Sequence, residues 1–366
     1  GRTCHGRWLC AGWAMTQAYD YRMPLYIVTG ILLLGLMKVA EAIFIPLALS
    51  LFAIALVWPL QARLQRLIPK LLALLISLLV MVAVIVAVAS AVAWGFGKLI
   101  QWLFANAAEL QAVWLGWLAW LDEHGLAIAA PLSERYNVGW LIGFMQNVVG
   151  RLNGMIGYGF LVVIFVMLGL LEVDSFGERL LAPGAQPFGR RLLHSNRLLG
   201  QKLRRYMLVR TFASILTGLV VWGLALFAGL ELAAAWGAIA FALNYIPFLG
   251  PLIATVFPTL FAIVQFDSWH MAIVIFIGLN LVQFVIGSYL EPLMTGVTLA
   301  ISPFAVVFAV FFGSFLWGVP GAFIGVPILI AIVVYCRESS STRWLADLLS
   351  ATGLGAMEDH VGVKDA

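Results

Sequence analysis

Residues 71–94, LLALLISLLVMVAVIVAVASAVAW, contain neither a charged residue nor a proline. A helix of this length crosses the roughly 30 Å of hydrocarbon in a bilayer. Because lipid offers no hydrogen-bond partners, a membrane-spanning backbone has to be satisfied within helices or a closed barrel. Barrel strands alternate apolar and polar side chains, and this run does not alternate. Similar runs recur, so the sequence predicts an all-α, polytopic membrane protein with about eight transmembrane helices.

Composition and motifs exclude several other classes of protein. Hydrophobic residues make up 63% of the chain and charged residues 10%, which is more apolar than a water-soluble domain. The net charge is +4, but the basic residues lie in connections between apolar runs, where they set topology, so we expect no nucleic-acid partner. The sequence has no GxxxxGK[ST], HExxH or GxSxG motif. We therefore expect neither an enzyme nor a bound metal or cofactor.

Charge and tryptophan content divide the chain into segments. The excess of Lys and Arg in 174–210 places that segment in the cytoplasm, and the tryptophans of 98–150 favour the headgroup layer. With these assignments both termini are predicted to be cytoplasmic. The predicted segments are 1–22, an N-terminal extension that is disordered or not native; 23–97, spans one to three; 98–150, external amphipathic helices; 151–173, span four; 174–210, a basic cytoplasmic helical segment; 211–335, the transport-core spans; and 336–366, a cytoplasmic tail.

Two apolar segments near the C-terminal end carry residues that interrupt helices. They are NYIPFLGPLIATVFP (244–258) and WGVPGAFIGVP (317–327). Proline lacks an amide donor and leaves a carbonyl unpaired, which is tolerated in a membrane only beside protein or water. Paired interruptions of this kind, re-entrant or kinked, point to the binding site of a transporter, and kinks that only aid packing are the alternative. The candidate pathway residues are Asn244, Pro247, Gly250, Pro251, Gly321, Gly325 and Pro327.

A polar face is predicted between the two interruptions. Asn280, Gln283, Gly287 and Glu291 fall within an arc of about 80° on a regular α-helix. Polar side chains that face lipid are costly, so this face should meet protein, water or cargo. Coupling to a proton or cation through Glu291 and a solvated charge at a helix end both stay open.

The order of motifs in this half of the chain resembles a known family. YIPFLGP, a polar helix ending in LEP, LAISPFAVV and GSFLWGVPGAFIGVP are similar to the autoinducer-2 exporter family, the PerM-like permeases, over most of 201–335. The resemblance implies an exporter or permease of the bacterial inner membrane that assembles as a homo-oligomer, with pentamers in the family. It adds Ser302 and Pro303 to the candidate pathway. Members carry signalling molecules, sodium or protons, so the resemblance does not name the cargo.

The sequence therefore predicts a secondary transporter that works by alternating access at the broken helices. Its cargo is a small polar solute or ion, such as the quorum-sensing signal autoinducer-2, and membrane lipids surround it. A cation/proton antiporter or a passive channel is the alternative. A membrane scaffold that transports nothing is the second alternative.

Overall fold

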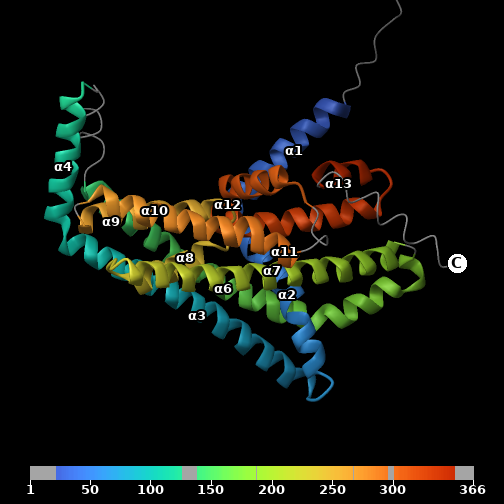
Figure 1. Ribbon diagram of the computed structural model, residues 1–366. Coiled ribbons are helices and arrows are strands. Elements are labelled where there is room, and N and C mark those ends of the chain that lie inside the picture. The colour runs from blue at the N-terminus through green and yellow to red at the C-terminus, as the bar shows by residue number, and fades with distance from the viewer. Residues whose placement is uncertain (1–21, 126–137, 187, 267, 296–300, 351–366) are drawn as a thin grey trace, which may run out of the picture. The chain divides into compact units, whose positions relative to one another are not determined.

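The computed structural model describes residues 22–125, 138–186, 188–266, 268–295 and 301–350 (Figure 1). All but the last residue of the predicted extension 1–22, part of the external segment and the end of the tail lie outside these residues. Apart from one isolated β-bridge, the regular elements described are helices. They are α1 (Arg22–Val39), α2 (Glu41–Leu64), α3 (Lys70–Ala105), α4 (Ala107–Glu123), α6 (Val138–Leu181), the 3₁₀ turn η1 (Pro183–Ala185), α7 (Phe188–Phe227), α8 (Ala233–Leu243), α9 (Leu249–Phe266), α10 (Trp269–Gln283), the π-helix η2 (Phe284–Leu290), α11 (Glu291–Thr295), α12 (Pro303–Glu338) and α13 (Arg343–Leu349).

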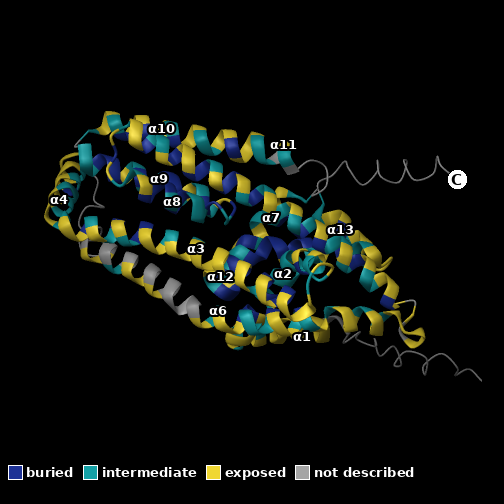
Figure 2. Cartoon of the chain, turned by 90° about the horizontal axis from the view of Figure 1, so that it is seen from below, coloured by how far each residue is buried: buried dark blue, intermediate teal, exposed yellow. Residues whose placement is uncertain are grey.

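The helices are long and apolar, as the sequence predicts. Within the described residues, seven helices are long and apolar enough to cross a membrane, and α8 and most of α1 are shorter apolar helices. Large apolar side chains cover much of the exposed surface, including Leu71, Leu75 and Leu79 on α3, and exposed positions recur along most helices in Figure 2. Such a surface suits lipid contact. The all-α polytopic fold is confirmed.

Helix α7 runs through a boundary that the sequence analysis had drawn. The basic segment was separated from the next span at residue 210, whereas the structure has one continuous helix of 40 residues. Its length is about 60 Å, roughly twice the hydrocarbon thickness. No proline occurs within it, and Leu, Arg and Lys favour helix, so nothing in the sequence stops the helix at the membrane surface. The basic half of α7 therefore extends beyond the span as part of the same rigid element.

Residues 1–41 and 42–366 form two separate compact units. In the first, the described structure is the helix α1. In the second, α7 packs against α6, α8, α10 and α12, while α3 packs against α6 and α8. The largest buried cluster joins α3, α7, α8, α9 and α10, and the buried positions of these helices are dark blue in Figure 2.

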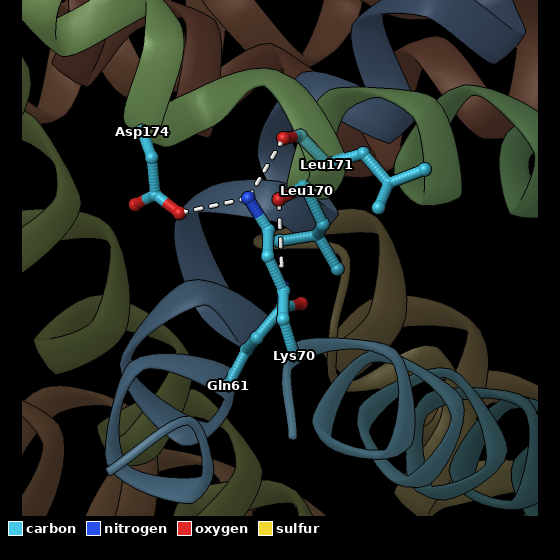
Figure 3. A network of polar contacts seen from close by, with 5 residues as sticks. All are labelled: Gln61, Lys70, Leu170, Leu171 and Asp174. Atoms are coloured by element: carbon cyan, nitrogen blue, oxygen red, sulfur yellow. Dashed lines mark hydrogen bonds and ion pairs between the residues drawn. The ribbon is translucent and has the colours of Figure 1, made fainter.

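Polar contacts join the start of α3 to α6, as Figure 3 shows. Lys70 Nζ lies 3.0 Å from an Asp174 carboxylate oxygen and donates to the Leu171 carbonyl at 3.2 Å. The fully buried Gln61 side chain of α2 donates to the Leu170 carbonyl at 3.4 Å. α2, α3 and α6 are thereby fixed together at one end.

Candidate functional site

Helix α7 carries polar side chains on its buried face. Arg210, Ser214 and Thr217 follow one another at helical spacing, with exposed fractions of 7%, 0% and 0%. They share an arc of about 60° at 100° per residue. Because α7 ends at Phe227, Ser214 lies about 20 Å along the helix from that end, which is within the span. We call these three residues the α7 polar stripe.

The first interrupted segment forms a helical hairpin. α8 ends at Leu243, α9 begins at Leu249, and Phe248 in the turn has a φ of 63°. A Cβ atom on Gly250 would lie 1.9 Å from the Leu243 carbonyl oxygen, so the two helices can approach this closely only at a glycine. Pro251 lies in the first turn of α9, where amide hydrogens have no partner within the helix. The interruption is therefore a tight turn and not a kink.

The tip of the α8–α9 hairpin contacts the α7 polar stripe. The Asn244 side-chain amide donates to Ser214 Oγ at 3.3 Å. One residue later, the Tyr245 hydroxyl donates to Thr211 Oγ1 on α7 at 3.1 Å. Pro247 is buried in the same turn. The break thus brings polar groups onto the buried face of a long helix.

The second interrupted segment is also a helical hairpin. Trp317 and Gly318 leave the helical conformation, and Gly318 has a φ of 63°, which favours glycine. Residues 303–316 and 319–338 form the two arms of α12. Pro320 lies in the first turn of the second arm, where its missing amide hydrogen breaks no helical bond. Glycine and proline thus make the turn between the arms.

Small residues let the two arms of α12 pack backbone to backbone. A Cβ atom on Gly321 would lie 1.9 Å from the Gly313 carbonyl oxygen, and one on Gly325 would lie 2.3 Å from the Ala309 carbonyl oxygen. These pairs fall on antiparallel positions one helical turn apart. Pro327 is buried within the second arm. The predicted residues Gly321 and Gly325 therefore hold the arms of the hairpin together.

The two interrupted segments meet in space. The rings of Tyr245, at the tip of the α8–α9 hairpin, and Phe323, on the second arm of α12, have centroids 6.3 Å apart. Phe323 also makes an edge contact with Phe52 on α2, with centroids 5.9 Å apart. The second arm of α12 further bonds α7 through the Tyr335 hydroxyl and the Asn196 side chain. Both hairpins therefore pack beside α7.

A charge pair lies at one end of the stripe. Arg210 Nη1 and Glu291 Oε1 are 2.5 Å apart, and the two side chains are 8% and 21% exposed. Glu291 directly follows the π-helix η2, and its amide bonds the Ile286 carbonyl, five residues earlier. π-helical segments are rare and are frequent at functional sites. The sequence analysis had counted Arg210 with the cytoplasmic basic segment, and the structure buries it against Glu291.

Some buried polar atoms here have no partner within the part of the chain that the structure describes. They include Thr217 Oγ1 and Arg210 Nε on the stripe. An unpaired buried polar group costs about 1–3 kcal/mol, and more where lipid excludes water. Both atoms lie on the face of α7 that the tip of the α8–α9 hairpin contacts, and a polar ligand there would satisfy them.

Other members of the predicted polar face are not gathered at this site. Asn280 is exposed and donates to the Phe276 carbonyl of its own helix at 2.8 Å. Gly287 is exposed with open space around it, and Gln283 is half-buried. The predicted arc assumed a regular α-helix, and the π-helix changes the number of residues per turn before Glu291. Of these four residues, Glu291 is the one that bonds the stripe.

Ser302 and Pro303 lie at the start of α12, at the far end of its first arm from the turn. Ser302 is the N-cap residue and Pro303 occupies the first turn. The Ser302 amide donates to the Leu349 carbonyl of α13 at 2.9 Å. These contacts anchor the base of the hairpin and do not bring either residue to the tips.

The sequence analysis missed the stripe itself. Ser214, Thr217 and their neighbour Thr211 lie in the predicted transport-core spans, and none of them is among the predicted pathway residues. The signal was present, because Arg210, Ser214 and Thr217 are spaced by four and three residues, the repeat of one helix face. Tyr245 carried no separate signal, since its role depends on the fold of the turn.

Comparison with known proteins identifies the family. The profile described as "AI-2E family transporter" matches residues 26–340. "Putative transport protein" of Borreliella burgdorferi is 28% identical over 344 residues, which is 93% of each chain. "AI-2 transport protein TqsA" of Escherichia coli is 28% identical over 206 residues, 56% of this chain and 59% of TqsA. A 145-residue match to YhhT of Escherichia coli is 32% identical and covers 39% of this chain and 41% of YhhT.

The family match covers the hairpins, the α7 polar stripe and the Arg210–Glu291 pair. It extends well beyond the half of the chain in which the sequence motifs were found. This chain is a multi-pass membrane protein that belongs to the AI-2E family of transporters.

Proposed function

We propose that this protein is a secondary transporter that moves a small polar solute or ion past the α7 polar stripe, with alternating access at the two hairpins. The observation that carries the proposal is the meeting of hairpin tip and stripe, where Thr217 Oγ1 and Arg210 Nε are buried and unpaired. Hydroxyl, amide and guanidinium groups at that depth suit a cargo with hydrogen-bonding groups or charge.

Movement of the hairpins as units would open the site. The arms of α12 are held by the close contact of Gly313 with Gly321, so bending within the hairpin is harder than shifting it as a whole. Its contacts to neighbouring helices include two aromatic pairs and one side-chain hydrogen bond, which involve Phe323 and Tyr335. The Asn244–Ser214 bond, at 3.3 Å, is long enough for a cargo oxygen to displace it readily. Rigid-body motion against a fixed helix is a common mode of alternating access.

The family relatives suggest cargoes to test. TqsA is named for autoinducer-2 transport, so that signal is the first candidate cargo. A cation/proton antiporter is the second candidate function. It is favoured by the Glu291 carboxylate, which is largely buried against Arg210, because acidic side chains inside membrane proteins often mark ion or proton pathways.

The test is flux into proteoliposomes that contain the purified chain. Uptake of autoinducer-2, sodium and potassium is measured with and without a pH gradient. We expect saturable uptake of one of them, and a loss of about tenfold or more in Thr217→Val, which removes the unpaired hydroxyl without changing the side-chain volume much. Thr259→Val is the matched control, because the Thr259 hydroxyl bonds the Thr255 carbonyl of its own helix.

The outcomes separate the proposed functions. Proton-coupled cation flux that Glu291→Gln abolishes supports the antiporter. Flux that rises linearly with concentration and ignores gradients supports a passive channel. Equal flux in the parent, Thr217→Val and empty liposomes for every cargo contradicts transport through this site and favours a scaffold.

We further propose that the protein is a homo-oligomer of the bacterial inner membrane, a pentamer by family resemblance, with both termini in the cytoplasm. The exposed Asn280 amide and the open surface at Gly287 support a protein neighbour along α10 and η2, since polar groups are costly against lipid. Native mass spectrometry of the purified chain tests the assembly. We expect Gly287→Trp to dissociate it, and a monomeric parent would contradict the proposal. Reporter fusions at each terminus test the topology.

A further inference from the structure

A hollow of about 420 Å³ lies between α7 and α11, on the basic side of the Arg210–Glu291 pair. Its lining residues combine positive charge, an amide and apolar side chains. They are Gln201, Arg204, Arg205, Leu208, Val209 and Met294. The polar members precede the apolar ones along α7, so the hollow has a polar end and an apolar end.

Each arginine of the hollow is fixed by one backbone carbonyl and keeps other donors free for a ligand. Arg204 Nη1 donates to the Ala55 carbonyl on α2 at 3.0 Å, and Arg205 Nη2 donates to the Met294 carbonyl at 3.2 Å. A guanidinium has five N–H donors. In the described residues neither side chain has a carboxylate within ion-pair distance. Arg204 and Arg205 thus place two positive charges, without an acidic partner in the described residues, at the hollow.

The position along α7 matches the headgroup layer of a bilayer. At 1.5 Å per residue, Arg204 and Arg205 lie about 33–35 Å from the end of the helix at Phe227. The hydrocarbon core is roughly 30 Å thick, so the two guanidinium groups lie just beyond it. Leu208 and Val209 are nearer Phe227 and reach the hydrocarbon edge. The order of the lining residues therefore follows the order of groups in a phospholipid.

We propose that this hollow binds an anionic phospholipid of the leaflet on the basic side, with its phosphate between Arg204 and Arg205 and the start of an acyl chain against Leu208 and Met294. Charge-assisted hydrogen bonds from arginine to phosphate are short and strong. Basic pockets between membrane helices are suited to anionic headgroups. Free phosphate would share the arginine contacts but would leave the apolar end unfilled. The proposal does not depend on which cargo the protein carries.

A bound lipid would also stabilise the position of α11, the short helix that begins with Glu291. Arg205 already bonds Met294, three residues after Glu291, so a phosphate that fixes Arg205 also fixes α11 against α7. This contact joins the lipid site to the Arg210–Glu291 pair through one short helix.

The experiment measures lipid binding to the purified full chain in detergent. Phosphatidylglycerol, phosphatidylcholine and inorganic phosphate are titrated separately, and bound ligand is read by native mass spectrometry and by the shift in melting temperature. We expect retention of phosphatidylglycerol, with an affinity about thirtyfold lower in Arg204→Gln/Arg205→Gln, because each arginine near an anionic surface contributes roughly a fivefold gain in affinity.

The matched control is Arg190→Gln/Arg197→Gln, which removes the same charge from positions of the same helix that do not line the hollow. Its affinity should stay within about twofold of the parent. If the hollow variant does not fold, Arg205→Gln alone is used, and about a fivefold loss is expected. Equal losses in the hollow and control variants, equal binding of phosphatidylcholine, or binding of inorganic phosphate as tight as that of the lipid would each overturn the proposal.

Discussion

The close contact between the arms of α12 predicts a large effect from adding a single methyl group. In Gly321→Ala the new Cβ atom would lie 1.9 Å from the Gly313 carbonyl oxygen, whereas ordinary van der Waals contact begins at 3.4 Å. The arms would have to part by about 1.5 Å, because the opposing atom is backbone and cannot rotate away. Overpacking of this kind costs about 1–3 kcal/mol, and we expect a loss of about 2–3 kcal/mol in the free energy of unfolding.

The assay is reversible unfolding in mixed micelles with increasing sodium dodecyl sulfate, followed by circular dichroism. Gly223→Ala is the control, because a Cβ there meets nothing within 4 Å and alanine favours helix. Its stability should stay level or rise by up to about 1 kcal/mol. The double variant Gly313→Ala/Gly321→Ala should cost less than the sum of the single changes, since one separation of the arms relieves both clashes.

A free energy of unfolding for Gly321→Ala within about 0.5 kcal/mol of the parent value would contradict the close contact, because surface changes without a structural cause fall in that range. The arms of α12 would then not be in backbone contact. If the losses in the free energy of unfolding from Gly313→Ala and Gly321→Ala were strictly additive, the two glycines would not share one contact. Transport by Gly321→Ala should fall together with stability if the hairpin moves as a unit.

Three further predictions concern single contacts. Glu291→Met leaves the Arg210 guanidinium buried without its carboxylate partner and should lower the free energy of unfolding by about 3–5 kcal/mol. The double variant Arg210→Met/Glu291→Met should recover part of that loss, and purely additive effects in the double-mutant cycle would contradict a coupled pair. Phe248→Gly should raise the free energy of unfolding by about 1 kcal/mol, because it relieves a positive φ of 63°, and Phe248→Ala, which keeps the strain, should not. Lys70→Met should cost less than about 1 kcal/mol in the same unfolding assay, since both Lys70 and Asp174 are 43% exposed, and a loss above 2 kcal/mol would contradict this estimate.

The helical fold and the two interruptions followed from local sequence. A long apolar run without charge has to form a helix or a barrel strand in lipid, and prolines close to glycines favour the end of one helix and the start of the next. The polar face predicted on 280–291 is only partly present in the structure. The angular argument assumed α-helical geometry, but η2 is a π-helix, so Glu291 reaches Arg210 while Asn280 faces outward. The spacing of polar and apolar residues does not predict a π-helix, because π-helices are rare and mostly occur as single turns within α-helices.

The bundle of membrane helices and the two breaks in its last third can be predicted from local sequence, because a long apolar segment in lipid has to satisfy its own backbone hydrogen bonds. That both breaks are hairpins, that Tyr245 meets Phe323 and that Arg210 is buried against Glu291 depend on the folded arrangement of the helices. These pairings join residues tens of positions apart. Their energies come from packing and desolvation, which depend on which helix faces which and cannot be read from any one segment.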